Sequence, residues 1–105
     1  MRFIETPIFT RLVKALVPDE DYRALQLALM LRPEQGALIQ GSGGLRKIRW
    51  GGSGRGKSGG LRIIYFWDNE QAAFYMLLAF AKNEQEDLTP EQLRILSRLV
   101  REEFK

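Results

Sequence analysis

The spacing of apolar residues in the first third of the chain predicts one short strand followed by two helices. Residues 2–5 form the strand, which ends at Thr6-Pro7 because proline has no amide hydrogen for a ladder and suits the first turn of a helix. Apolar side chains then recur at helical intervals over residues 8–17 and 19–32. Each helix has one apolar stripe, which is typical of helices that pack on a sheet.

The middle of the chain changes to runs of β-branched and aromatic residues separated by turn-forming residues, which is typical of an antiparallel meander. We expect the strands at residues 45–50, 61–67 and 72–81. Glycines at positions 36, 41, 43 and 44 predict an irregular connection before them.

The C-terminal segment carries the start signal of another helix. Thr89 can cap it, Pro90 can take its first position and Gln92 sits where a capping box needs it, so we expect a helix to about Glu103. The resulting order, β-α-α-β-β-β-α, predicts a compact α+β domain with its helices packed on one sheet face and the other face open to a ligand.

Composition limits both the size of the fold and its chemistry. A chain of 105 residues with 45% apolar content can bury one core, so we expect a single domain over residues 1–105. It has no cysteine and no histidine, so thiol chemistry, the commonest metal ligand and the usual proton shuttle are excluded. We expect no metal and no cofactor. A secretory signal core is lacking and no apolar run approaches the ~20 residues of a membrane span, so we expect a cytoplasmic protein.

Charge is distributed unevenly along the chain. Acids cluster at residues 19–21 and 84–87, whereas none occurs between Gln35 and Trp67. That interval contains six cations: Arg46, Lys47, Arg49, Arg55, Lys57 and Arg62. A positive field on a β-hairpin, with no carboxylate in it, is typical of a surface that binds phosphates, so nucleic acid is the expected partner.

Strand alternation brings part of this charge to one face. Lys47 and Arg49 share a face while Ile48 points to the core, and Arg62 on the next strand can join them. Lys82, directly after the last strand, can close the patch. Because like charges facing each other destabilise an empty sheet, cations without carboxylate partners favour a ligand-binding role.

The Gly/Ser-rich segment 51–58 matches the phosphate-loop pattern of nucleotide triphosphatases letter for letter. That loop requires a following helix, but Gly59-Gly60 and a strand follow here, so we expect no nucleotide triphosphate. Arg55 and Lys57 at the loop tip are instead candidate RNA contacts. Trp50 is the best candidate among the aromatics for stacking on a base, although aromatics of a central strand usually belong to the core.

The string Gly43 to Arg49, the run 56–65 and the triplet Lys82-Asn83-Glu84 resemble the RelE superfamily of bacterial toxins, particularly its HigB-type branch. The resemblance covers nearly the whole chain. It implies a ribosome-dependent endoribonuclease that cuts mRNA in the ribosomal A site. It also implies neutralisation by an antitoxin with a helix-turn-helix DNA-binding domain. The family's basic pair falls on Lys47 and Arg49, its catalytic arginine on Arg62 and its later basic residue on Lys82.

This chemistry is feasible without histidine or metal, because the 2′-hydroxyl of RNA can attack the adjacent phosphate. Arg62 suits the phosphorane oxygens, and Lys57 or Lys82 could transfer a proton if neighbouring cations lower its pKa. Some relatives have a catalytic Tyr or His shortly after the last basic residue, where this chain reads Glu-Gln-Glu-Asp at 84–87. The identity of the general base therefore stays open, with Glu84 a weaker candidate.

Three other functions are compatible with the same residues. The chain could be a non-catalytic RNA-binding module, a gyrase-poisoning member of the same superfamily, or a degenerate toxin that only binds an antitoxin and represses transcription. Retention of Arg62 and Lys82 favours the nuclease.

Overall fold

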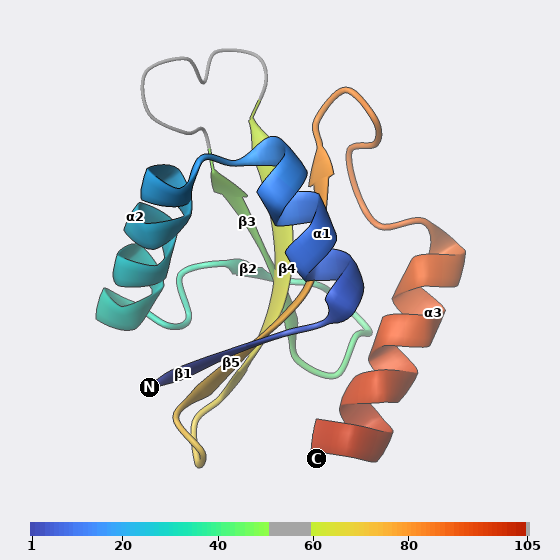
Figure 1. The fold of residues 1–105 in the computed structure, drawn as a ribbon. Helices are drawn as coiled ribbons and strands as arrows, with labels where there is room; N and C mark the ends of the chain where they lie inside the picture. The colour runs from blue at the N-terminus through green and yellow to red at the C-terminus, as the bar shows by residue number, and fades with distance from the viewer. Residues whose placement is uncertain (51–59, 105) are drawn as a thin grey trace.

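The computed structural model describes residues 1–50 and 60–104, with three α-helices and five strands in those ranges (Figure 1). None of the helices described there is long and apolar enough to cross a bilayer. The elements are β1 (Arg2–Glu5), α1 (Pro7–Leu16), α2 (Asp19–Leu31), β2 (Ala37–Leu38), β3 (Leu45–Trp50), β4 (Leu61–Asp68), β5 (Ala73–Ala81), α3 (Pro90–Leu99) and a π-helical turn, η1 (Val100–Phe104).

The helix starts follow the local signals in the sequence. At α1 the Thr6 side chain accepts a hydrogen bond from the Phe9 amide at 3.0 Å, and Pro7 takes the first position. At α3 the predicted capping box forms in full, with Thr89 and Gln92 each accepting from the other's amide. These contacts satisfy amides that have no partner within the helix, which confirms both predicted starts.

The sheet has the strand order β1-β5-β4-β3-β2. Strands β3, β4 and β5 form the predicted antiparallel meander. Strand β1 adds to it in parallel with β5, so the sheet is mixed. The connection expected to be irregular contains β2, which pairs with β3 through two residues. A strand this short, in a glycine-rich segment, has too few residues to show an alternating pattern.

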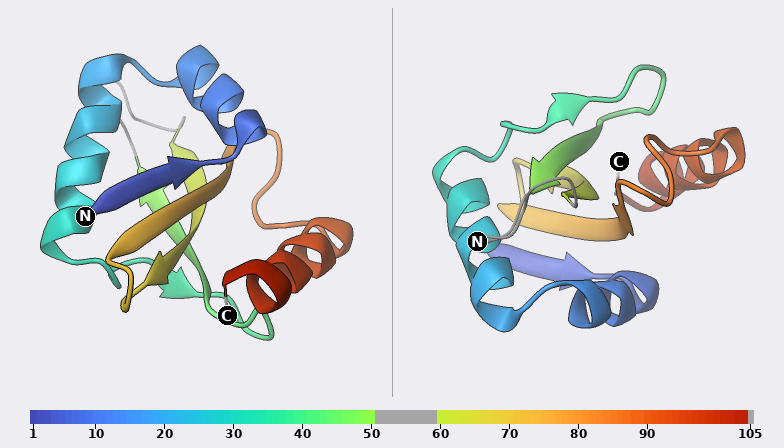
Figure 2. Two further views of the ribbon diagram at one scale, coloured as in Figure 1. Left: turned by 60° about the horizontal axis from the view of Figure 1, so that its bottom comes forward. Right: turned by 90° about the horizontal axis from the view of Figure 1, so that it is seen from above.

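The sheet carries a helix layer on each face. Helices α1 and α2 bury Phe9, Val13 and Leu25 with one face of β4, including Ile63 and Tyr65. The third helix packs on the opposite face through residues that include Leu96, and η1 adds Val100. Figure 2 shows α2 and α3 on opposite sides of the strands. The predicted α+β class is confirmed, but the expectation that all helices share one sheet face is wrong, because the apolar stripe of α3 has its own partners there: Leu45, Ile64, Phe66, Leu77 and Phe80.

This second face is divided along its length. Leu45 and Phe66, which pair across β3 and β4, lie in the α3 cluster. Arg49 and Arg62 pair at the other end of the same two strands. The third helix therefore covers the apolar end of the face and leaves a polar end.

The connection before β2 is anchored to the sheet by Tyr65. The buried Tyr65 hydroxyl donates to the Pro33 carbonyl at 2.8 Å and accepts from the Gly36 amide at 3.0 Å. A Cβ atom on Gly36 would lie 2.8 Å from Tyr65 Cε1 and 3.1 Å from the Lys47 carbonyl oxygen. Glycine is therefore required at position 36, because the Tyr65 ring and the Lys47 backbone leave no space for a side chain.

Gly36→Ala should lower the free energy of unfolding by about 1–3 kcal/mol, because the buried ring cannot retreat without strain. Urea denaturation of the wild-type and variant proteins measures the difference. Gln40→Ala, at an exposed position in the same connection, is the control and should stay within about 0.5 kcal/mol of wild type. Equal denaturation midpoints for Gly36→Ala and wild type would contradict the predicted clash.

Candidate nucleic-acid interface

Four cations from the polar end of the sheet form what we call the basic surface: Lys47, Arg49, Arg62 and Lys82. Strand β3 supplies Lys47 and Arg49, β4 supplies Arg62, and Lys82 directly follows β5. In the β3–β4 register Arg49 and Arg62 stand directly opposite each other. Alternation puts Lys47, Arg49 and Arg62 on the face away from Ile48, which packs in the cluster of α1 and α2.

Arg62 is the most enclosed of these cations. Its exposure is only 3%, which corrects the expectation of a charge on an open face. Its Nη2 donates to Glu86 Oε2 at 2.8 Å. Its Nε is buried and has no hydrogen-bond partner within residues 1–50 and 60–104. A guanidinium held in this way is oriented by the fold and still has donor capacity.

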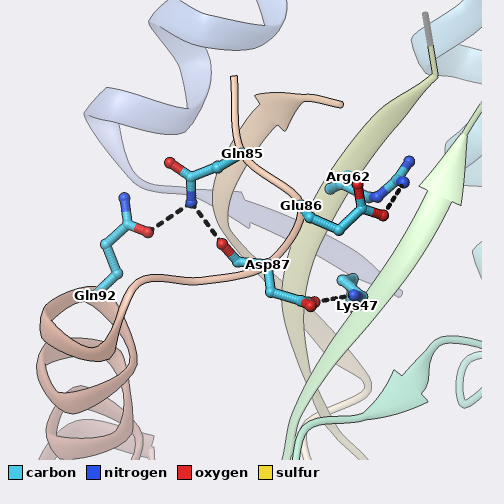
Figure 3. A network of polar contacts seen from close by, with 6 residues as sticks. All are labelled: Lys47, Arg62, Gln85, Glu86, Asp87 and Gln92. Atoms are coloured by element: carbon cyan, nitrogen blue, oxygen red, sulfur yellow. Dashed lines mark hydrogen bonds and ion pairs between the residues drawn. The ribbon is translucent and has the colours of Figure 1, made fainter. Parts of the chain in front are cut away.

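Carboxylates reach the basic surface from outside the hairpin. In the connection between β5 and α3, Glu86 pairs with Arg62 and Asp87 pairs with Lys47 (Figure 3). The expectation that the converging cations lack carboxylate partners is therefore wrong. The acids at 84–87 are visible in the sequence, but no local signal places them over strands that lie 24 and 40 residues earlier.

The conformation of this acidic loop, residues 84–87, is set partly by α3. Gln85 Nε2 donates to the Asp87 carbonyl at 2.9 Å and to Gln92 Oε1 at 2.8 Å, and so links the loop to the capping box (Figure 3). Glu84, the candidate base, accepts from the Ala81 amide at 3.1 Å. Its carboxylate thus closes the turn after β5, whereas Glu86 is the acid that contacts Arg62.

The charge of the site is reflected in the titration of Glu86. The hydrogen bond from Arg62 and the charge of that guanidinium lower the pKa of the Glu86 carboxyl, and Lys82 and Arg49 lower it further. Glu86 is therefore ionised at neutral pH and is a weak proton acceptor. These cations thus favour an anion at the position of the Glu86 carboxylate.

Of the remaining predicted residues, Trp50 alone lies in the described part of the chain. Trp50 packs, partly buried, against the core on the α1 and α2 face. Arg55 and Lys57 lie outside the described residues. An open cavity of about 550 Å³, lined in part by Arg32 and Trp67, lies toward the other end of β4. Among the described residues no group of His, Cys, Asp or Glu is arranged to hold a metal ion.

Comparison with protein families agrees with this geometry. The family model described as the RelE toxin of the RelE / RelB toxin-antitoxin system matches residues 1–105. The match spans the helices, the mixed sheet and the basic surface together. The chain therefore belongs to the RelE toxin family, and it is the toxin component of a toxin–antitoxin system.

Proposed function

We propose that this toxin is an endoribonuclease that cleaves translated mRNA in the ribosomal A site. The observation that carries the proposal is the contact at 2.8 Å between the nearly buried Arg62 and the Glu86 carboxylate, at the end of the sheet that also carries Arg49 and Lys82. A position where an arginine holds an anion beside further cations suits a phosphate group, and more strongly a phosphorane, which has one more negative charge. RNA has such groups at each nucleotide.

In this mechanism the RNA supplies its own nucleophile. The 2′-hydroxyl gives up its proton to a base and its oxygen forms a bond to phosphorus. The bond from phosphorus to the 5′-oxygen breaks and that oxygen takes up a proton, so a cyclic phosphate and a 5′-hydroxyl result. Arg62 donates to the non-bridging oxygens as their charge rises, and Arg49 adds positive field from the neighbouring strand. Lys82 and Lys57 are the candidates for protonating the leaving oxygen. Positioning of the message by the ribosome compensates for the lack of histidine.

The toxin's partner is a cognate antitoxin, as the RelE family implies. We assign the chain to the HigB-type branch on the string Gly43 to Arg49, and we place it in the cytoplasm with the ribosome. The antitoxin of this branch carries a helix-turn-helix DNA-binding domain. Blocking access of the ribosome to the basic surface would neutralise the toxin, and an acidic segment of the antitoxin would be complementary to this surface.

Expression of the chain without its antitoxin should stop growth through loss of translation, with mRNA breaks inside translated codons. Mapping of RNA 5′ ends in expressing cells measures this, and cells with Arg62→Ala at equal expression are the control. Damaged DNA with intact mRNA would support the gyrase-poisoning alternative. Ribosome or RNA binding without breaks would support a non-catalytic RNA-binding module.

A further inference from the structure

Two adjacent acids of one loop are paired with two cations of adjacent strands, at the surface to which the proposed function assigns RNA. We propose that Glu86 and Asp87 occupy, in the free toxin, the positions that two phosphates of the RNA take when it binds. RNA binding and these two ion pairs then exclude each other. This inference rests on the proposed function for its ligand, and its test separates the two.

Glu86 does not accept a hydrogen bond from every donor of the Arg62 guanidinium. Glu86 Oε2 takes one donor, Nη2, at 2.8 Å. The neighbouring Nε is buried without a partner in the described part of the chain. A phosphate has several oxygens and can accept from both donors of the guanidinium fork, as bidentate arginine contacts do. Replacing the carboxylate by a phosphate would thus satisfy a donor that Glu86 leaves free.

Burial shows which half of each ion pair can move. The side chains of Lys47 and Arg62 are 19% and 4% exposed, whereas those of Asp87 and Glu86 are 67% and 58% exposed. The cations are fixed in the sheet and the acids lie on the solvent side. A buried guanidinium without an anion is costly, so the site favours exchange of one anion for another over an empty state.

Glu86 and Asp87 can leave the basic surface without unfolding of the acidic loop. Glu84 is bound to the end of β5 through the Ala81 amide, and Leu88 packs in the apolar cluster of α3. Between these anchors Glu86 and Asp87 contact the sheet through side-chain ion pairs. Rotation of two exposed side chains is therefore enough to clear the surface.

A second role for Glu86, as the general base, fits the observations less well. A base that takes the 2′-hydroxyl proton works best with a pKa near the working pH. Arg62 and its neighbouring cations lower the pKa of the Glu86 carboxyl instead. These cations stabilise the anion and weaken it as a base, as expected for a group in a phosphate position.

The test measures binding of a short single-stranded RNA to the free toxin, without ribosomes, by fluorescence anisotropy. Glu86→Gln with Asp87→Asn should bind about tenfold more tightly than wild type, since the apparent affinity rises as the competent fraction approaches one. The control, Glu91→Gln with Glu102→Gln, removes two charges as well. Glu91 pairs with Arg94 on the surface of α3 and Glu102 is exposed on η1, so the control should change affinity by about twofold at most.

The other outcomes would contradict either the competition between these acids and RNA or the proposed function, and they can be told apart. Equal tightening in both double variants would mean that net charge alone is responsible. Unchanged binding of the Glu86 and Asp87 variant would mean that these acids do not compete with RNA. Unchanged binding with loss of cleavage in Glu86→Gln alone would identify a general base. Failure of the wild-type toxin to break translated mRNA would overturn the proposed function, whatever the order of RNA affinities.

Discussion

Arg62→Ala is expected to slow mRNA cleavage by about two orders of magnitude. The reason is the loss of roughly 3 kcal/mol of transition-state stabilisation, the amount typical for one preorganised donor at a developing charge. Cleavage of a defined message on purified ribosomes measures the effect. Because Arg62 is only 3% exposed, its removal also leaves a gap and deprives Glu86 of its partner, so the melting temperature must be measured on the same sample.

Two further variants separate chemistry from folding and from net charge. Arg62→Lys keeps the positive charge but lacks the planar fork of the guanidinium. Its melting temperature should therefore be closer to that of wild type than the melting temperature of Arg62→Ala, while it cleaves mRNA at least about tenfold more slowly than wild type. Arg94→Ala removes an equal charge from the exposed face of α3 and should cleave at the wild-type rate. Full activity of folded Arg62→Ala would show that this guanidinium is not catalytic.

The features that the sequence predicts well are those with local causes. The start of α3 needs only Thr89, Pro90 and Gln92 within four positions, and the structure forms that cap in full. Alternation along β3 likewise puts Lys47 and Arg49 on one face of the sheet and Ile48 on the other, and this follows from the strand alone. Such signals act between residues that are close in the chain.

The features that sequence reasoning missed depend on contacts between distant segments. The burial of Arg62 follows from residues around it on other elements, and its pairing with Glu86 follows from how the connection after β5 crosses the sheet. The position of α3 on the second face was missed because an apolar stripe shows that a helix packs, but not on which face. These long-range contacts matter for function, because the basic surface was expected to lack acids and instead contains two ion pairs.

Charge reversal of the hairpin, Lys47→Glu with Arg49→Glu, should weaken ribosome binding by about two orders of magnitude or more. In the proposed interface Lys47 and Arg49 face phosphates. Their reversal turns two cations into anions, and each lost phosphate contact also removes counterion release. The slope of log affinity against log salt should therefore fall by about 1.4 if the RNA is single-stranded. Binding to purified ribosomes over a series of salt concentrations measures both quantities.

The fold should survive this reversal, and that makes the result interpretable. Arg49 is exposed and lies opposite Arg62, so Arg49→Glu replaces a like-charge pair with an opposite-charge pair. Lys47→Glu repels Asp87, but Asp87 is on an exposed loop that can move away.

The control, Arg98→Glu with Arg101→Glu, makes the same change in net charge at exposed positions of α3 and η1 and should keep most of the affinity. If the Lys47 and Arg49 variant bound ribosomes as tightly as wild type, the docking surface would have to lie elsewhere. Equal weakening of the two would mean that total charge, rather than the basic surface, governs docking.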